Sequence, residues 1–317
     1  RERPGFLQVL TGQLVTKQML FLGFSFTDPN LAHLFASIRE AFQDDGPEHY
    51  AIVRRPKKGS GPGAKKRFET EKVRHALWVE DLQRYGIQCI EIDEYEEIDE
   101  ILRAVELKLA GRSVFVSGSY PESAPNDDRR HIEEMARQIG REIARREKRL
   151  VSGFGLVVGS AAIAGALEII LAGPAPNLER GLLLRPFPQA IPKGMAKAVF
   201  HKRYRQAMVQ QAGVSIFIGG LKDTGKAAPV IADGVLEEFK EAQAAGRIVV
   251  PIGATGGAAR EIWKQLAKDA AWAPPGLNRK EFEQLNKDGL APVDAAKLID
   301  KVLKAVDAPA GKGKKQP

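Results

Sequence analysis

The sequence predicts an α/β protein built from two Rossmann-like parallel-sheet units, the first incomplete and the second doubly wound. Short apolar runs of strand length alternate with longer segments of helical periodicity. Several of the runs end in glycine, as at Gly23, Gly118 and Gly219, where a parallel strand would give way to a loop. The length of 317 residues allows about two domains.

In the first unit, apolar runs predict strands at residues 19–23, 49–53 and 87–92. Apolar residues at helical spacing predict helices at about residues 31–38, 69–85 and 98–109. The segment from Leu7 to Val15 leads straight towards the first strand, without an obvious start of a domain. Three strands are too few for a complete domain, and the chain begins with Arg1 rather than Met, so we expect further residues before Arg1 in the natural protein.

The second unit begins near Arg112. Its predicted strands lie at residues 114–119, 150–152, 181–186, 214–218 and 248–252. Its predicted helices lie at about residues 130–146, 159–172, 202–211 and 234–245, with one or two more between 282 and 306. This alternation favours a doubly wound sheet with right-handed crossovers. The expected domains are therefore residues 1–110 and 111–308, followed by a disordered basic tail at 309–317.

Composition excludes several classes of protein. The single cysteine, Cys89, rules out a disulfide framework and a cysteine-based zinc site, and its apolar neighbours indicate a core position. No apolar run reaches the roughly 18 residues that span a bilayer. We therefore expect a soluble, cytoplasmic protein with no membrane partner.

The net charge of +8 is concentrated in two places, between Arg54 and Arg67 and between Lys312 and Lys315. A basic block of this kind can bind phosphate or nucleic acid. Glycine, serine and proline interrupt the first block, and no aromatic residue is interleaved with its basic residues. A solvated loop is therefore the favoured interpretation, and nucleic acid is not an expected partner.

The sequence offers little support for conventional catalysis in the second unit. The five histidines are scattered, without the spacing of a metal site, and neither a nucleophile elbow nor a Walker A sequence occurs. His201 lies beside Lys202 and Arg203 and is interpreted as a solvated basic residue rather than a general base. We expect no metal, and residues 112–317 have the character of a binding domain.

Glycine junctions at three predicted strand ends suggest a nucleotide-type pocket. The candidate residues are Gly118 and Ser119, then Gly153, Phe154 and Gly155, and finally Gly219 and Gly220. In an open α/β sheet, ligands lie where strands end and helices begin. Backbone amides at a helix N-terminus can hold an anion there, and glycine permits close approach. The alternative is that these glycines only form turns.

Three charged residues strengthen the pocket hypothesis. Arg205, Lys222 and Glu237 are spaced 17 and 15 residues apart, on a helix, after a strand end and in the first turns of the next helix. Two cations near one strand end suit a pyrophosphate, and a carboxylate suits ribose hydroxyls. The alternative is that all three are ordinary surface charges.

The order of these motifs resembles the SLOG superfamily of nucleotide-sensing Rossmann-like domains. The similarity extends over residues 112–256 and rests on Val116 to Ser119, Gly153 to Gly155, Ile218 to Gly220 and Gly234 to Phe239. The first unit resembles the C-terminal half of a Sir2-like domain, through the stretch from Phe21 to Leu31. That resemblance implies NAD contacts by Gly23, Phe24, Ser25 and Asp28.

A Sir2-like domain followed by a SLOG domain is similar to the NAD⁺-hydrolysing effector of Thoeris antiphage defence. The resemblance implies that a partner TIR protein makes a cyclic ADP-ribose isomer, which Arg205, Lys222 and Glu237 would bind. Binding would rearrange a homotetramer and activate NAD⁺ hydrolysis. The catalytic Asn and His are expected upstream of Arg1.

Two other functions remain open at this point. The chain could be a non-catalytic nucleotide-binding sensor or assembly module. It could also be a phosphoribohydrolase, although the Pro-Gly-Gly-x-Gly-Thr-x-x-Glu motif of those enzymes is represented only by Ile218 to Lys222, with the glutamate pair much later.

Overall fold

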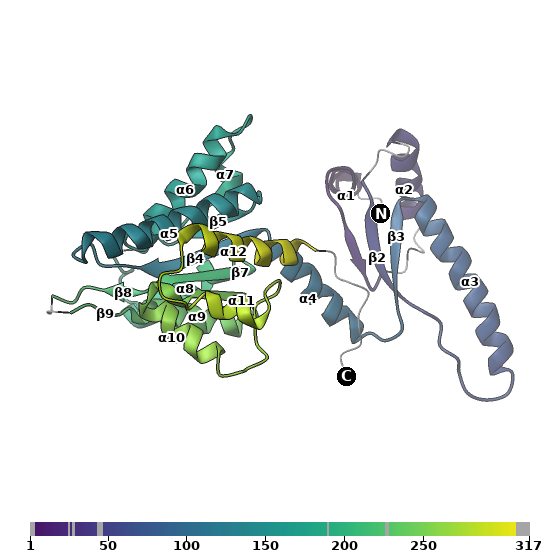
Figure 1. Ribbon diagram of the computed structural model, residues 1–317. Helices are drawn as coiled ribbons and strands as arrows, with labels where there is room; N and C mark the ends of the chain where they lie inside the picture. The colour runs from purple at the N-terminus through teal and green to yellow at the C-terminus, as the bar shows by residue number, and fades with distance from the viewer. Residues whose placement is uncertain are drawn as a thin grey trace. The chain divides into compact units, whose positions relative to one another are not determined.

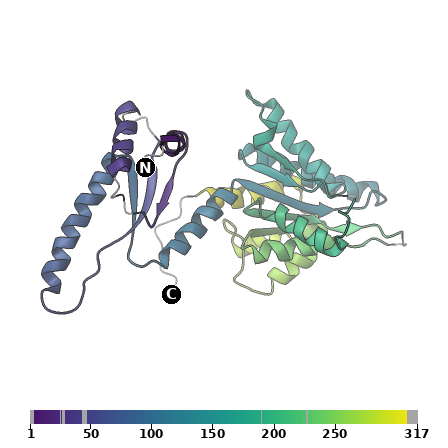
Figure 2. The same cartoon turned by 180° about the vertical axis from the view of Figure 1, so that it is seen from behind.

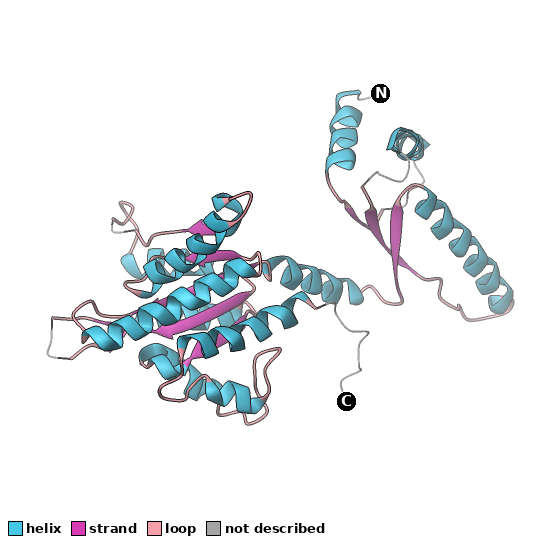
Figure 3. Cartoon of the chain, turned by 45° about the horizontal axis from the view of Figure 1, so that its top comes forward, coloured by secondary structure: helices cyan, strands magenta, loops and turns pink. Residues whose placement is uncertain are grey.

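The computed structural model describes residues 4–24, 26, 29–42, 47–188, 190–225 and 228–308. Its internal contacts divide the chain after Ala104 into two units, each of which is described by itself. Both units contain a layer of parallel strands with helices against it (Figure 3). The α/β class with parallel sheets is therefore confirmed. The domain boundaries at 110 and 308 stay predictions, and the tail at 309–317 lies outside the described residues.

The first unit has a three-stranded sheet of order β1-β2-β3, with every pair parallel (Figure 1). Its core is formed by the buried side chains of Leu14, Phe35, Val53, Leu82 and Ile87. Cys89 is half-buried against this core rather than fully inside it. The elements are α1 (Pro4–Thr16), β1 (Leu20–Leu22), α2 (Pro29–Phe42), β2 (His49–Arg54), α3 (Ala64–Arg84), β3 (Ile87–Ile92) and α4 (Glu97–Ala110), which ends in the second unit.

Helix α1 is an element that the sequence prediction missed. Its sequence signal consists of Leu10 and Leu14, which lie one helical turn apart and both pack into the core. Leu14 is fully buried. Pro4 stands at the first helical position, where the missing N–H costs nothing.

The basic block after β2 is only partly a solvated loop. Residues 55–63 form a loop, but α3 begins at Ala64, so Lys65 and Lys66 lie in its first turn. Gly63, at φ 75°, precedes the helix. The parallel strands β2 and β3 end at the same edge of the sheet, which brings the start of the block against an acidic segment. The contacts are Arg54 over the Tyr95 ring at 4.5 Å, Arg55 with Asp93 at 3.2 Å and Lys57 with Glu94.

The second unit has a five-stranded parallel sheet of order β10-β7-β4-β5-β6. The elements are β4 (Ser113–Ser119), α5 (Asn126–Arg145), β5 (Arg149–Ser152), α6 (Val158–Ala172), α7 (Leu178–Gly181), β6 (Leu182–Leu184), α8 (Lys197–Val209), β7 (Val214–Gly219), β8 (Leu221–Lys222), β9 (Val230–Ile231), α9 (Asp233–Ala244), β10 (Ile248–Ile252), η2 (Gly253–Thr255), α10 (Gly257–Leu266), α11 (Arg279–Gln284) and α12 (Pro292–Asp307).

The central strands of this sheet are buried on both faces, and their side chains alternate between two cores. On β4, Val114 and Val116 pack with α5, α6 and α12. Phe115 points the other way, into a second core with α8, α9 and α10, which Figure 2 brings forward. Ser117 shares this second face, because it lies two residues after Phe115. The sheet is thus doubly wound, as predicted.

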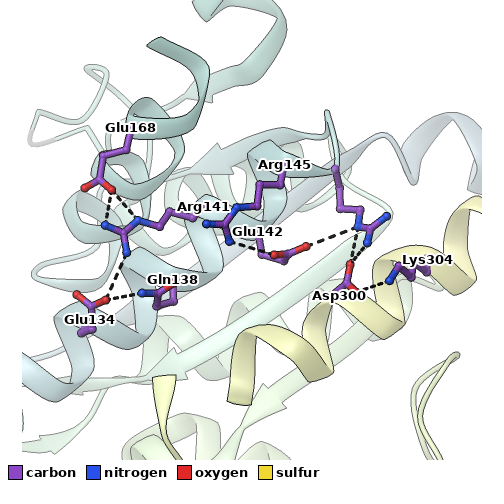
Figure 4. Close-up of polar contacts among 9 residues, drawn as sticks. Glu134, Gln138, Arg141, Glu142, Arg145, Glu168, Asp300 and Lys304 are labelled. Atoms are coloured by element: carbon purple, nitrogen blue, oxygen red, sulfur yellow. Dashed lines mark hydrogen bonds and ion pairs between the residues drawn. The ribbon is translucent and has the colours of Figure 1, made fainter. Parts of the chain in front are cut away.

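Ion pairs join the helices of the first face (Figure 4). Arg141 of α5 bonds Glu168 of α6, with Nε to Oε2 at 2.6 Å. At the other end of α5, Arg146 bonds Asp300 of α12, which also pairs with Lys304 at 2.7 Å. Glu142 lies between the two sets, and burial, followed by the neighbouring Asp300, raises the pKa of its carboxyl.

Hydrogen bonds from two lysines connect the segment before β4 with the end of α12. Lys148 is only 3% exposed and donates 2.7 Å hydrogen bonds to the Gly111 carbonyl and to Asp307 Oδ1. Lys108 of α4 donates to the last carbonyls of α12, including that of Asp307 at 2.7 Å. The start of the first strand and the end of the last helix of the unit therefore lie side by side.

The β8–β9 hairpin was not predicted, since its strands have only two residues each and pair antiparallel beyond the end of β7. Other boundaries moved by a few residues. Helix α8 starts at Lys197 rather than residue 202, and β6 is limited to Leu182–Leu184 because residue 181 ends α7.

Candidate nucleotide site

The strand order places a topological switch point between β4 and β7. From β4 the chain first adds β5 and β6 on one side of it, then crosses to β7 and β10 on the other. In open α/β sheets, ligands bind at the carboxyl ends of the strands where this reversal occurs. An open cavity of about 350 Å³ lies there, at the ends of β4 and β5 and beside α8 and α9.

Most of the predicted signal-binding residues line this cavity. They come from four separate segments of the chain, and the lining includes Gly118, Ser119, Gly153, Phe154, Gly155, Arg205 and Lys222. The structure therefore brings together two glycine junctions and both predicted cations.

Glycine is required at two of these positions for steric reasons. A Cβ on Gly118 would lie 2.0 Å from the Ile218 carbonyl oxygen, and one on Gly155 would lie 1.9 Å from the Gly118 carbonyl oxygen. The end of β4 can therefore lie close both to β7 and to the loop after β5, and its backbone forms part of the cavity wall. Between the glycines, Phe154 has φ 58° and is 45% exposed, so a ring is held at the cavity in a backbone conformation that few residues adopt.

The diglycine at the end of β7 has a structural role. Gly219 and Gly220 are not among the described residues that line the cavity. The Gly219 N–H donates to Thr255 Oγ1 at 2.7 Å, and the Gly220 carbonyl accepts from Ala232 and Ala258. A Cβ on Gly220 would lie 2.5 Å from that of Ala258. The pair allows α10 to pack against the end of β7.

Arg205 of α8 is held over the cavity by several contacts. Its guanidinium lies 5.1 Å from the Phe187 ring centroid and forms an ion pair through Nη1 with Glu237 of α9. Gly234 also lies against the guanidinium, since a Cβ there would be 2.9 Å from Nη2. The side chain is only 15% exposed, so its charge is partly desolvated.

Lys222 reaches the same cavity from β8 and forms an ion pair with Asp233 at the start of α9. Hydrogen bonding to Lys222 lowers the pKa of the Asp233 carboxyl. Both cavity cations are thus paired with carboxylates of α9, and an anionic ligand would have to compete with them.

Glu237 and its neighbour Glu238 point in different directions. Glu237 lines a neighbouring cavity with His201, Lys240 and Glu241. Glu238 lines the nucleotide-type cavity and is 13% exposed, and its Oε2 accepts a 2.5 Å hydrogen bond from Ser117 Oγ. Burial raises the pKa of Glu238 to about 7, although the Ser117 hydrogen bond and Arg205 act in the opposite direction.

Sequence reasoning therefore missed Glu238, and a signal for it was present. Val235, Phe239 and Ala242 are the buried residues of α9. Glu238 falls on the same stripe, three residues after Val235 and four before Ala242, whereas Glu237 is turned away from it. Ser117 was passed over because it stands inside an apolar strand, and Phe187 because it lies in the loop after β6.

His201 was predicted to be a solvated basic residue, and the structure places it half-buried against an aromatic ring. Its ring packs edge-on against Phe187 at 4.8 Å, and burial, helped by Arg205 and Lys197, lowers its pKa.

The predicted NAD contacts of the first unit lie at the end of β1. Gly23 has φ 63°, and Phe24 packs against Phe21 and Phe26 with ring centroids 5.5 and 4.8 Å away. Phe24 is 40% exposed. Ser25 and Asp28 lie outside the described residues.

The residues that the structure describes contain no group of three or more His, Cys, Asp or Glu side chains able to hold a metal ion. No helix in the same part of the chain is long and apolar enough to cross a membrane.

Known proteins resemble the chain over nearly its whole length. The sequence model of the Sir2- and TIR-associating SLOG family matches residues 97–308, and that of the SIR2-like domain matches residues 1–82. The NAD(+) hydrolase ThsA of Bacillus cereus (strain MSX-D12) is 34% identical over 305 residues, and that of Enterococcus faecium is 30% identical over 307. Each alignment covers 95% of this chain and 62% of the relative, so the chain spans less than two thirds of their length.

Proposed function

Because this chain belongs to the Sir2- and TIR-associating SLOG family, we propose that it is the larger part of a regulated NAD⁺ hydrolase of antiphage defence. The second unit would sense a cyclic ADP-ribose isomer, and the first would belong to the NAD⁺-hydrolysing domain. The observation that carries the proposal is the cavity at the switch point, where Arg205 and Lys222 converge on two glycine-lined strand ends.

The cavity suits a dinucleotide-type ligand on three grounds. Two cations, Arg205 and Lys222, can neutralise phosphates. Backbone at Gly153 and Gly155 can approach a phosphate without side-chain interference. Phe154 offers an exposed aromatic ring at the cavity, and such rings stack on bases.

NAD⁺ hydrolysis itself is assigned to the Sir2-like part of the natural protein. Gly23, Phe24, Ser25 and Asp28 would contact NAD⁺, and the catalytic Asn and His would precede Arg1. The relatives from Bacillus cereus and Enterococcus faecium are NAD(+) hydrolases and extend well beyond the aligned region, which supports this division. Cytoplasmic location is part of the same proposal, since NAD⁺ is the substrate.

Activation is proposed to follow from a population shift. A signal nucleotide can switch the enzyme on only if it binds the active arrangement of the protein more tightly than the resting one. The ion pairs of Arg205 with Glu237 and of Lys222 with Asp233 would be rearranged by phosphates that enter the cavity. A homotetramer is the proposed assembly, and a TIR-domain partner is the proposed source of the signal.

The test compares NAD⁺ consumption by the natural protein, including any residues before Arg1, with that by this chain. Cyclic ADP-ribose isomers are added in turn. Hydrolysis by the longer protein that depends on one isomer, together with binding of that isomer by this chain, is the expected result. Constant hydrolysis without any nucleotide, or no binding by either protein, would contradict the proposal.

A second candidate is a nucleotide-binding sensor or assembly module with no catalytic role. It is favoured by one observation, that the described lining of the cavity comes from the second unit alone. Binding of the nucleotide without NAD⁺ consumption by the longer protein would support this alternative.

A further inference from the structure

Arg247 is a buried arginine whose hydrogen bonds are incomplete. It lies between the end of α9 and the start of β10, and its side chain is only 5% exposed. Its Nη2 donates a 2.9 Å hydrogen bond to Glu106 Oε1 on α4. Its Nε and Nη1 are buried and have no hydrogen-bond partner among the residues that the structure describes. Buried donors without an acceptor are costly, so a second arrangement of this contact that satisfies them would be favoured.

The missing acceptor must come from the protein, because both donors are enclosed and a ligand in solvent cannot reach them. Glu106 is placed to supply it. A guanidinium has two edges that form a two-bond fork with a carboxylate, and both of these edges include Nη2. Glu106 already binds Nη2 through one oxygen, and its side chain is 61% exposed and has room to turn. A small shift of Arg247 relative to α4 would therefore complete the fork.

Arg247 is attached to α9, and the other end of this helix lies at the nucleotide-type cavity. The Arg247 N–H donates to the Ala242 carbonyl in the last turn of α9 at 2.9 Å. At the first turn of the helix, Asp233 and Gly234 line the cavity. A helix of 12 residues is a stiff rod about 18 Å long. A displacement of α9 at the cavity would therefore also displace Arg247.

An anion in the cavity would act directly on α9. Lys222 is paired with Asp233 and Arg205 with Glu237, and both carboxylates belong to this helix. A phosphate that binds these cations weakens the two ion pairs, which removes contacts that hold α9 in its position. Occupancy of the cavity can thus change the position of the helix whose far end leads to Arg247.

Helix α4 is held on the second unit by contacts at its end, since none of its residues is buried. The Gly213 N–H donates to the Ala110 carbonyl at 2.7 Å, and Lys108 donates to the last carbonyls of α12. Glu106 adds its ion pair with Arg247. The boundary between the two units falls within α4. A change at Glu106 therefore acts on the helix through which the chain passes from the first unit to the second.

We propose that Arg247 and Glu106 couple occupancy of the nucleotide-type cavity to the way α4 is held. In this structure the two residues share one hydrogen bond, and in the nucleotide-bound arrangement they form the two-bond fork, which holds α4 more firmly. Arg247 is a positioning residue, because it is not among the described residues that line the cavity. The inference rests on the proposed function in one respect, that the cavity binds a nucleotide. Because coupling between sites is reciprocal, loss of the fork must weaken nucleotide binding.

The first test uses isothermal titration calorimetry of the full chain with ADP-ribose and with cyclic ADP-ribose. Glu106→Gln keeps the shape and removes the charge, and Arg247→Lys keeps the charge but cannot form a fork. The matched control is Glu261→Gln on α10, because Glu261 pairs with Lys264 at the same distance of 2.9 Å. We expect Glu106→Gln and Arg247→Lys each to weaken binding about threefold to tenfold. The control should bind as the wild type does.

Amide hydrogen exchange followed by mass spectrometry gives a readout that a merely structural role of the ion pair would not move. In the wild-type chain, a bound nucleotide should slow exchange at residues 105–110 of α4 by about threefold or more. In Glu106→Gln the same nucleotide, at a saturating concentration, should leave exchange at these residues unchanged. The difference between the two chains reports the coupling, because the ligand occupies the cavity in both.

The outcomes separate this inference from the function on which it rests. If the wild-type chain binds neither nucleotide, the proposed function fails and the coupling fails with it. If a nucleotide binds but Glu106→Gln has the wild-type affinity, or if binding does not slow exchange at residues 105–110, the coupling is overturned and the function stands. Should circular dichroism show that Arg247→Lys does not fold, Glu106→Gln still decides, because it alters an exposed side chain.

Discussion

Ser117, near the end of β4, donates a 2.5 Å hydrogen bond to Glu238, which lies 121 residues later in the second turn of α9. The bond connects the central strand of the sheet to a helix of its second face, at the switch point where the cavity lies. It also holds a carboxyl group whose pKa of about 7 leaves it partly protonated at neutral pH. Perturbed carboxyl groups of this kind concentrate at functional sites.

Glu238→Gln is expected to stabilise the protein at alkaline pH. The folded-state pKa of about 7 lies above the ordinary value of 4.5, so the folded chain holds a proton that the unfolded chain releases between these values. The stability of the wild type therefore falls as pH rises from 4.5 to 7. The variant should gain up to about 3 kcal/mol at pH 8 and much less at pH 5, measured by urea unfolding. An equal gain at both pH values would contradict the assignment.

Nucleotide binding should strengthen as pH rises through about 7. A ligand hydroxyl that donates to Glu238 favours the ionised carboxyl, so binding releases a proton. The charged and titratable groups that line this cavity or face Glu238 are Arg205, Lys222, Asp233, Glu237 and, in the neighbouring cavity, His201. The pKa of His201 is lowered, so its titration falls below that of Glu238. Calorimetry at pH 6, 7 and 8 should show a slope for the wild type that is lost in Glu238→Gln.

Lys222→Ala should weaken nucleotide binding about tenfold or more without unfolding the chain. The ammonium is partly exposed and pairs with the exposed carboxylate of Asp233, so its loss costs little stability. A phosphate would lose a charge-assisted contact. Lys264→Ala, on α10 with a similar pairing to Glu261, is the matched control and should leave affinity unchanged. Unchanged affinity in a folded Lys222→Ala chain would remove Lys222 from the site.

Gly220→Ala should destabilise the second unit more than Gly246→Ala. Both glycines have positive φ, which costs about 1–2 kcal/mol for alanine. At Gly220 the new methyl would also overlap Ala258, whereas at Gly246 it meets open space. We expect a further loss of about 1–3 kcal/mol at Gly220, seen as a lower urea midpoint. Equal losses would argue against the tight packing of α10 on β7.

Asp300→Asn and Glu142→Gln should change the free energy of unfolding differently, although both residues belong to one network of ion pairs (Figure 4). Asp300 is the shared partner of Arg146 and Lys304, so its neutralisation should cost about 1–2 kcal/mol. The raised pKa of Glu142 means that its ionised form is disfavoured in the folded chain. Glu142→Gln should therefore leave the free energy of unfolding at pH 8 unchanged or increase it. A larger loss for Glu142→Gln than for Asp300→Asn would contradict this.

The strand and helix order was predictable because buried parallel strands are almost continuously apolar. The run from Val214 to Ile218 is an example, since every residue in it is buried. The β8–β9 hairpin could not be found this way, because its paired residues, Leu221 with Ile231 and Lys222 with Val230, are few and not buried. The start of α3 was misplaced because Lys65 and Lys66 occur equally well in a loop and in the first turn of a helix.

The candidate site was predictable to the level of segments. Strand ends that share a sheet edge must converge, so Gly118 and Gly153 could be brought together from the sequence. Choosing between Glu237 and Glu238 required the orientation of α9, which its buried residues determine. The ion pair of Arg205 with Glu237 could not be predicted, because it depends on how α8 packs on α9 and no local sequence pattern indicates that packing.

The junction at Lys148 has a practical consequence. Since Lys148 ties Gly111 to Asp307, the entry and exit of the second unit are within one side chain's reach. A segment whose ends meet can be inserted into a surface loop of another protein without stretching its host. A segment with the predicted bounds 111–308 is thus suited to insertion into a surface loop of a host protein.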